Sequence, residues 1–113
     1  MYPSITPEPG RPPEYTAVQH ILSSPAVLAR CRPHIGADDF DWPALLAAAE
    51  TMSSGEQLLV RIAYDLWEAK GIVGVWELPR LLDGPNFRRV IAALGMCRGD
   101  VDRRSLEVLR DAA

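Results

Sequence analysis

The sequence predicts an all-α fold, a compact domain of five or six helices around a central helix at about residues 54–70. Three observations support this prediction. Apolar residues recur at intervals of three and four over most of the chain, which is the spacing of amphipathic helices. Proline, glycine or aspartate interrupts this pattern where helices are expected to begin or end. The length of 113 residues suits a single domain.

The N-terminal segment, residues 1–13, contains five of the ten prolines. Because proline fixes φ and lacks a backbone N–H, we expect this segment to be a disordered or extended tail. The alternative to a plain flexible tail is a docking segment, since extended proline-rich segments bind partners at a low entropic cost. Residues 14–113 are expected to form the single helical domain.

The first half of this domain reads as three helices. One is expected from Pro13, and Pro25 should end it and begin a second, with Ser23 or Ser24 as the cap. Residues 32–40 are expected to form a loop. Asp41 then has the position of an N-cap residue for the third helix.

The central helix is expected to begin within the run SSGEQ, residues 53–57. This run resembles the signature motif of ABC-type ATPases, in which a Ser-Gly pair at a helix start contacts a nucleotide. The chain has no Walker A loop to hold the phosphates, so the resemblance does not extend to a nucleotide site. Either Ser53 with Glu56 or Ser54 with Gln57 fits a capping box instead. The helix should end at Lys70, with Gly71 in the left-handed conformation.

The second half begins with residues 71–75, which read as a short strand or as a connector whose Ile72 and Val73 fill the core. Residues 76–83 are expected to form a short helix, and residues 85–97 a longer one. The inward residues of the longer helix are expected to be Phe87, Val90, Ile91 and Leu94. Asp100 can cap a last helix, in which Val101, Leu106 and Leu109 would be the apolar contacts.

Composition limits the class of function. The net charge is −3, whereas proteins that bind many nucleic acid phosphates usually carry a basic excess. No apolar run is long enough to cross a membrane, and no apolar secretory segment is present at the N-terminus, so we expect a cytoplasmic protein with reduced cysteines. Arginine greatly outnumbers lysine, which indicates a high-GC source such as an actinobacterium, or a phage or mobile element of one.

Three aromatic residues are candidates for binding a partner protein. Phe40 and Trp42 lie among acidic residues at the start of the third helix, in the run ADDFDWPALL, and acidic-hydrophobic helices dock into grooves of partner proteins. The spacing of Phe40 and Leu45 also fits a hydrophobic staple, but Trp42 has no such explanation and is expected to be partly exposed. Trp76 follows Gly74 and is also a candidate, because tryptophan is enriched at binding hot spots. Core packing is the alternative for both tryptophans.

A nucleic-acid interface is the alternative function. Residues 76–97 resemble the helix-turn-helix of bacterial regulators, with Gly84 in the turn. DNA would be bound by residues 85–98, with Asn86, Arg88 and Arg89 near the start of the second helix, where such proteins contact bases and phosphates. Plain helix packing with solvated arginines explains the same residues.

Metal and catalytic sites have little support. Cys31 and His34 form only one tight pair, whereas structural zinc usually requires two. The aspartates at 38, 39 and 41 lie near His34, but acidic loops before helices more often supply caps. We therefore predict a small non-enzymatic protein-binding module without a cofactor, catalytic residues or metal ligands.

Overall fold

The computed structural model describes residues 13–37 and 39–99, which form six α-helices and one short 3₁₀ helix. The elements in chain order are α1 (Pro13–Leu22), α2 (Pro25–Cys31), η1 (Arg32–His34), α3 (Trp42–Ala49), α4 (Ser54–Glu68), α5 (Glu77–Leu81) and α6 (Gly84–Arg98). Within this part of the chain no strand forms, and the one β-type pairing is an isolated bridge. The predicted all-α fold is therefore confirmed. The expected tail before residue 13 and the expected helix after Asp100 lie outside the described residues.

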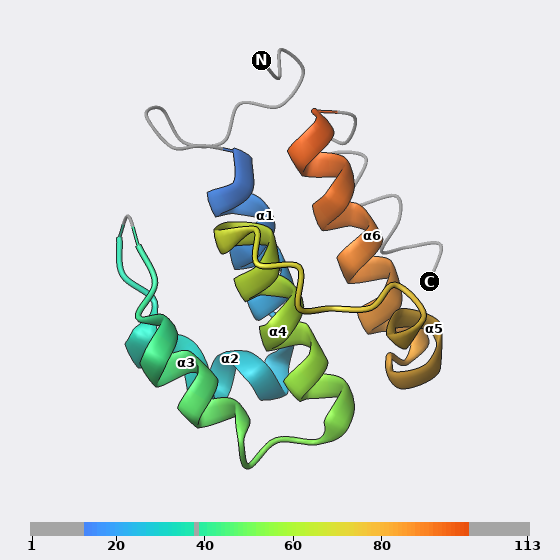
Figure 1. Ribbon diagram of the computed structural model, residues 1–113. Helices are drawn as coiled ribbons and strands as arrows, with labels where there is room; N and C mark the ends of the chain where they lie inside the picture. The colour runs from blue at the N-terminus through green and yellow to red at the C-terminus, as the bar shows by residue number, and fades with distance from the viewer. Residues whose placement is uncertain (1–12, 38, 100–113) are drawn as a thin grey trace.

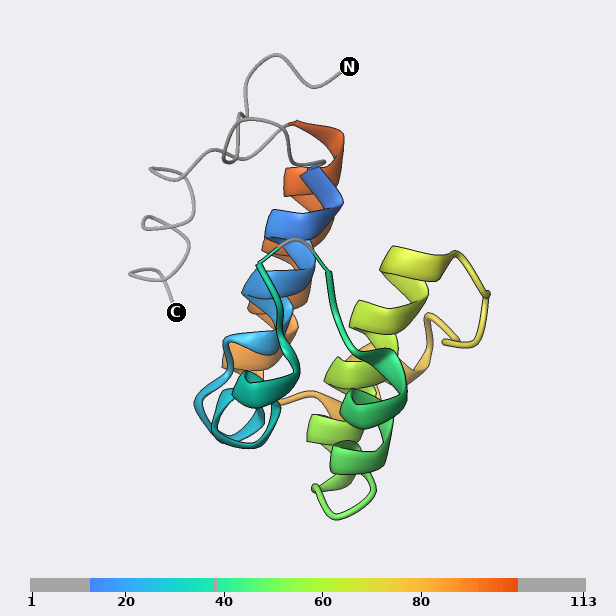
Figure 2. The same cartoon turned by 90° about the vertical axis from the view of Figure 1, so that its left-hand side faces the viewer.

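Helix α1 lies between the two longest helices. It packs most extensively against α6 and against α4, and Figures 1 and 2 show α1 and α6 side by side. The helix predicted to be central, α4, is present and contacts α1, α2, α3 and α5. The buried residues of α1 are Tyr15, Ala17, Val18, Ile21 and Leu22. These residues cover more than one side of the helix, so α1 can contact a neighbour on each.

The start of α4 has the predicted capping box. The hydroxyl of Ser53 accepts from the backbone N–H of Glu56 at 3.3 Å, and the Glu56 carboxylate accepts from the backbone N–H of Ser53 at 3.0 Å. The Ser54 and Gln57 alternative is not used, because the Gln57 amide donates to the carbonyls of Glu50 and Met52. The run SSGEQ thus marks a helix N-terminus, where side chains satisfy backbone groups that the helix leaves unpaired.

Two other predicted helix starts are present. The Asp41 carboxylate accepts from the backbone N–H of Ala44 at 3.2 Å and caps α3. Ser24 occupies the N-cap position of α2 without a side-chain hydrogen bond, and Pro25 follows in the first turn. Proline suits that position because its ring already has the φ angle of a helix.

The end of α4 differs in detail from the prediction. The helix ends at Glu68, and the residue that leaves it in the left-handed conformation is Ala69, with φ of 55°. Gly71 also has a positive φ, 68°, as predicted, but it lies two residues further on. Residues 69–76 then form a connector to α5, and its Val73 packs against the core while Ile72 is exposed.

Helix α6 presents a different face to the core from the one expected. Val90 is buried as predicted, and Phe87 is partly buried against the core. Ile91 and Leu94 are exposed, and Ala93 and Met96 are buried in their place. Alanine lets two helix backbones approach closely, so the small residues of α6 face α1. The prediction for Ile91 and Leu94 was therefore wrong.

Candidate functional site

Two of the aromatic residues proposed to bind a partner lie in the core. Phe40 and Trp42 are 5% and 6% exposed, so the expectation of a partly exposed Trp42 was wrong. The Phe40 ring lies 5.1 Å from Tyr15, 5.3 Å from Trp42 and 5.1 Å from Trp67, between ring centroids. An antiparallel bridge between Ile35 and Phe40 folds the loop back so that these rings meet. Side chains in such a cluster stabilise the fold and offer no surface to a partner.

Trp76 has the opposite environment. Its side chain is 65% exposed, and that of the preceding Val75 is 82% exposed. Ile72 and Leu81 are the other exposed large apolar residues of the connector and α5. We call these four residues, together with Arg80, the Trp76 surface. The Arg80 guanidinium lies over the indole at 5.7 Å from the ring centroid, in cation–π geometry.

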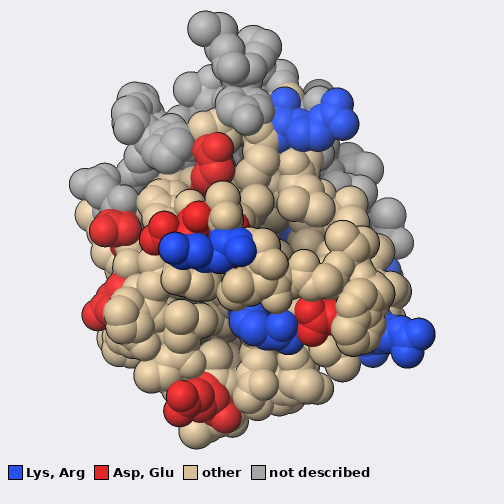
Figure 3. Space-filling model, viewed as in Figure 1, with Lys and Arg blue, Asp and Glu red and all other residues tan. Residues whose placement is uncertain are grey.

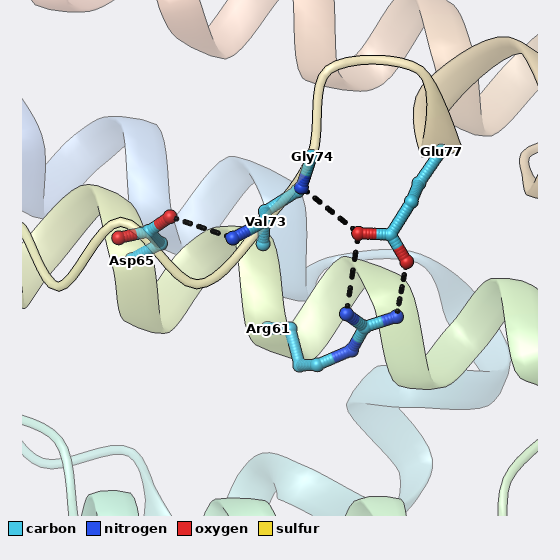
Figure 4. A network of polar contacts seen from close by, with 5 residues as sticks. All are labelled: Arg61, Asp65, Val73, Gly74 and Glu77. Carbon is cyan, nitrogen blue, oxygen red and sulfur yellow. Dashed lines mark hydrogen bonds and ion pairs between the residues drawn. The ribbon is translucent and has the colours of Figure 1, made fainter.

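The first half of the connector is fixed by one carboxylate of α4. Asp65 accepts hydrogen bonds from three consecutive backbone N–H groups, those of Gly71, Ile72 at 3.0 Å and Val73 at 3.2 Å. Figure 4 shows this carboxylate pointing at the connector from α4. Charge-assisted hydrogen bonds of this kind are stronger than neutral ones, so the backbone that carries Ile72 and Val75 is held in one conformation.

The second half is fixed by an ion pair between α4 and α5. The Glu77 carboxylate accepts from both terminal nitrogens of Arg61, at 3.4 and 3.1 Å, and from the backbone N–H of Gly74 at 2.9 Å. Figure 4 shows the two parallel bonds between Arg61 and Glu77. The hydrogen bond from Arg61, followed by that from Gly74, holds the pKa of Glu77 below its ordinary value of 4.5.

Gly74 also sets the place of the Trp76 ring. A Cβ atom at residue 74 would lie 2.6 Å from the indole Nε1 of Trp76, closer than two such atoms can approach. The indole therefore lies directly against the backbone of Gly74, and any side chain there would displace it. The exposed ring thus has two neighbours, the Gly74 backbone beside its Nε1–Cδ1 edge and the Arg80 guanidinium over the ring.

The lowered pKa of Glu77 gives a pH prediction. A carboxylate whose pKa is lowered by folding contributes stability above its unfolded pKa, and this contribution is lost as pH falls through the folded value. We expect the Gly74 amide resonance in NMR spectra to be constant above pH 4.5 and to shift as the pH falls from there through the lower pKa of Glu77. The variant Glu77→Gln should lack this titration. A Gly74 resonance that titrated at or above pH 4.5 would contradict the assignment.

The two arginines proposed to bind nucleic acid, Arg88 and Arg89, make contacts within the protein itself. Arg89 donates to Ser23 Oγ at 2.7 Å, to the carbonyl of His20 at 3.4 Å and to the side chain of Asn86 at 3.4 Å. The guanidinium of Arg88 folds back over the first turn of α6, within 3.3 Å of where a Gly84 Cβ would lie. These contacts do not favour DNA recognition, for which the side chains must extend from the helix.

The two helices of the proposed helix-turn-helix also pack on different partners. Helix α5 packs mainly against α4, whereas α6 packs mainly against α1. Figure 3 shows acidic and basic side chains interspersed over the face that the connector crosses, with uncharged residues between them. A helix-turn-helix protein would be expected to concentrate positive charge around its recognition helix.

The hydrogen bonds of Arg89 predict a role in stability. Arg89 joins α6 to the C-terminal end of α1 through Ser23 and His20, and hydrogen bonds of charged groups contribute about 1.5–3 kcal/mol. We expect Arg89→Ala to lower the free energy of unfolding in urea by about 1–2 kcal/mol. Arg32→Ala, at an exposed arginine of η1, serves as the matched arginine control and should have a smaller effect. An Arg89→Ala variant as stable as the wild type would show that these bonds do not contribute.

The remaining candidates are the side chains that could bind a metal ion. Within residues 13–37 and 39–99, no three His, Cys, Asp or Glu side chains are placed to hold a metal ion. Cys31 and Cys97 are free thiols, and burial raises the pKa of both. The pKa of Cys97 reaches about 11, with Glu14 as the second cause. Both are therefore protonated at neutral pH, and a thiol is a poorer nucleophile and metal ligand than a thiolate.

Comparisons with known proteins identify no relative. Protein-family models, curated proteins and solved structures all give no match to this chain. The described helices also include none that is long and apolar enough to cross a lipid bilayer.

Proposed function

We propose that this protein is a small non-enzymatic binding module that docks another protein through the Trp76 surface. The observation that carries the proposal is the exposure of Trp76 and Val75, at 65% and 82%, on a connector that carboxylates fix at both ends. Exposed tryptophan and arginine are the side chains most enriched at the centres of protein interfaces.

The ordered backbone of the connector favours a docking role for the exposed Trp76 and Val75 side chains. A mobile loop would lose conformational entropy on binding, at a cost of about 0.5–1.5 kcal/mol for each immobilised flexible side chain. Here Asp65 and Glu77 have already ordered the backbone, and Arg80 and Gly74 have placed the indole. Less of the binding energy is therefore used to order the surface.

The charges around the connector support an apolar contact. Arg61 and Glu77 pair with each other, and the Asp65 carboxylate is occupied by backbone N–H groups. A partner would not need to remove these charges from water unpaired, which is the main cost of burying polar groups. The contact would be apolar at its centre, with Arg80 as the cation on the indole.

The proposal predicts that Trp76→Ala abolishes partner binding. We expect a protein captured from extracts of the source organism by the wild type to be lost, or reduced at least about tenfold, with Trp76→Ala, since hot-spot truncations cost 2 kcal/mol or more. Ile91→Ala is the matched control, because Ile91 is also an exposed apolar residue but lies on α6. Circular dichroism should show both variants folded. A partner retained equally by all three proteins would rule out the Trp76 surface as the docking site.

The nucleic-acid alternative has its own test. Binding to random duplex DNA should be measured at low and at moderate salt, because phosphate contacts produce a steep salt dependence. On the present proposal no salt-sensitive binding is expected at micromolar protein. If such binding appeared and Arg88→Ala removed it, a helix-turn-helix function would replace protein docking.

A further inference from the structure

We infer that the Trp76 surface binds an acidic segment of another protein, in which an Asp or Glu side chain lies next to a large apolar residue. This inference rests on the proposed function, because it uses the same docking surface and specifies the chemistry of its occupant. The carboxylate of the segment binds the guanidinium of Arg80, and its apolar neighbour packs on Trp76 and Val75.

Arg80 offers the surface's charge to a partner. Its guanidinium carbon lies 5.7 Å from the centroid of the Trp76 ring, and the residue is exposed. Within residues 13–37 and 39–99 no hydrogen bond or ion pair engages Arg80, whereas Arg61 is bound to Glu77. A guanidinium has several N–H donors and no acceptor, so its hydrogen bonds go to water or to acceptors of a partner. A carboxylate can accept two of these bonds in parallel, which makes it a well-matched protein side chain.

The position of Arg80 on the indole selects against a basic partner. The negative face of a tryptophan ring attracts Lys and Arg side chains, so an indole without a cation would favour a basic segment. Here the ring already carries a cation, and a second one would meet a like charge beside the same ring. The same geometry places a guanidinium next to an apolar ring. An acidic side chain and an apolar neighbour can therefore be bound together.

The acids that fix the connector do not compete for Arg80. Both carboxylate oxygens of Glu77 are engaged, by Arg61 and by the backbone N–H of Gly74, and the Glu77 side chain is only 13% exposed. Asp65 accepts from the backbone N–H groups of residues 71–73. An incoming carboxylate thus pairs with a charge that these acids leave unpaired.

Single-stranded nucleic acid is another anionic partner that arginine and tryptophan side chains bind. It requires a positively charged groove that follows the backbone of the strand. The residues that flank Trp76 and Arg80 in the chain, Val75 and Leu81, are instead exposed apolar side chains. This pattern fits a peptide with one acidic residue beside an apolar one better than it fits a row of phosphates.

Peptide selection with the full chain tests the inference. Displayed random peptides of about twelve residues should be enriched in sequences in which Asp or Glu adjoins Leu, Ile, Phe or Trp. The selected peptides should bind when synthesised with both ends blocked, so that side chains supply every carboxylate. Enrichment of basic sequences, no enrichment, or binding that requires a free C-terminus would overturn the inference. So would tighter binding of single-stranded oligothymidylate that Arg80→Gln abolishes.

Variants of Arg80 give a second measurement. Arg80→Gln should weaken binding of a selected peptide by about tenfold to a hundredfold, because a hydrogen bond between charged groups is lost. Replacing the acidic residue of the peptide by its amide should have the same effect, and both changes together should cost little more than either one. Arg32→Gln removes the same charge from η1 and should leave binding unchanged. Equal binding by the wild type and Arg80→Gln would overturn the inference.

The capture experiment separates this inference from the proposed function. A partner from cell extracts that is lost with Trp76→Ala but retained with Arg80→Gln would support docking at the Trp76 surface and overturn the acidic partner. A partner that is retained by both variants would overturn both. We expect both variants to lose the partner while Arg32→Gln and Ile91→Ala retain it.

Discussion

Tyr15→Ala is expected to lower the free energy of unfolding by about 3–5 kcal/mol, the cost of truncating a buried aromatic residue. Tyr15 is 2% exposed, and its ring lies 5.1 Å from Phe40 and 6.2 Å from Trp67, between centroids. It thus joins α1 to the loop before α3 and to α4. Since small domains have a total stability of about 5–15 kcal/mol, the variant should melt more than about 10 °C below the wild type or fail to fold.

Tyr15→Phe separates the ring from the hydroxyl. The hydroxyl donates to the carbonyl of Gly36 at 2.8 Å, and Gly36 is itself exposed, so water can replace the lost donor. We expect this variant to lose only about 1 kcal/mol, the net value of an ordinary hydrogen bond. Urea unfolding of both variants gives the comparison. If Tyr15→Phe were as unstable as Tyr15→Ala, the hydrogen bond rather than the aromatic packing would hold the loop.

Gly55→Ala is expected to destabilise the protein, although alanine usually stabilises a helix relative to glycine by about 0.5–1 kcal/mol. A Cβ atom at residue 55 would lie 2.7 Å from the backbone carbonyl oxygen of Leu81, which cannot move without the end of α5. Overpacking of this kind costs about 1–3 kcal/mol. The sign of the change in unfolding free energy is therefore the opposite of the one that helix propensity alone predicts.

Ser54→Ala is the matched control for Gly55→Ala. Ser54 is the neighbouring residue in the first turn of α4, and its side chain is exposed. We expect its replacement to change stability by less than about 0.5 kcal/mol. Because Gly55→Ala should displace α5, it should also weaken binding at the Trp76 surface. A Gly55→Ala variant more stable than the wild type would show that α4 and α5 do not approach as closely as described.

The beginnings of the helices were predictable because local chemistry determines them. The capping box of Ser53 and Glu56, the N-cap at Asp41 and the helix start at Pro25 each involve residues within a few positions of one another. An N-cap side chain accepts a hydrogen bond from a backbone N–H three positions away, and this local bond does not depend on tertiary contacts. The helical class and the approximate bounds of α1 to α6 followed from these signals and from the apolar spacing.

The candidate site was only partly predictable. Residue type alone points equally to Trp76 and to Trp42, but Trp76 is exposed and Trp42 is buried. One sequence signal distinguishes them: Trp42 has an aromatic neighbour, Phe40, two positions before it, whereas Trp76 has none nearby and follows Gly74. The packing of Trp42 against Tyr64 of α4 is decided by the tertiary structure. The acidic residues that fix this connector, Asp65 and Glu77, read as ordinary surface charges in the sequence.

The sequence by itself determined the helical class, the helix starts and the presence of tryptophans and arginines in particular segments. Only the tertiary structure decided which of these tryptophan and arginine side chains are exposed to solvent. The faces of α6 show the reason: Ile91 and Leu94 have helical spacing as good as that of Ala93 and Met96, yet only the second pair is buried. Spacing fixes which residues share a face, but the packing of α1 against α6 selects the face, and that contact joins residues about seventy positions apart.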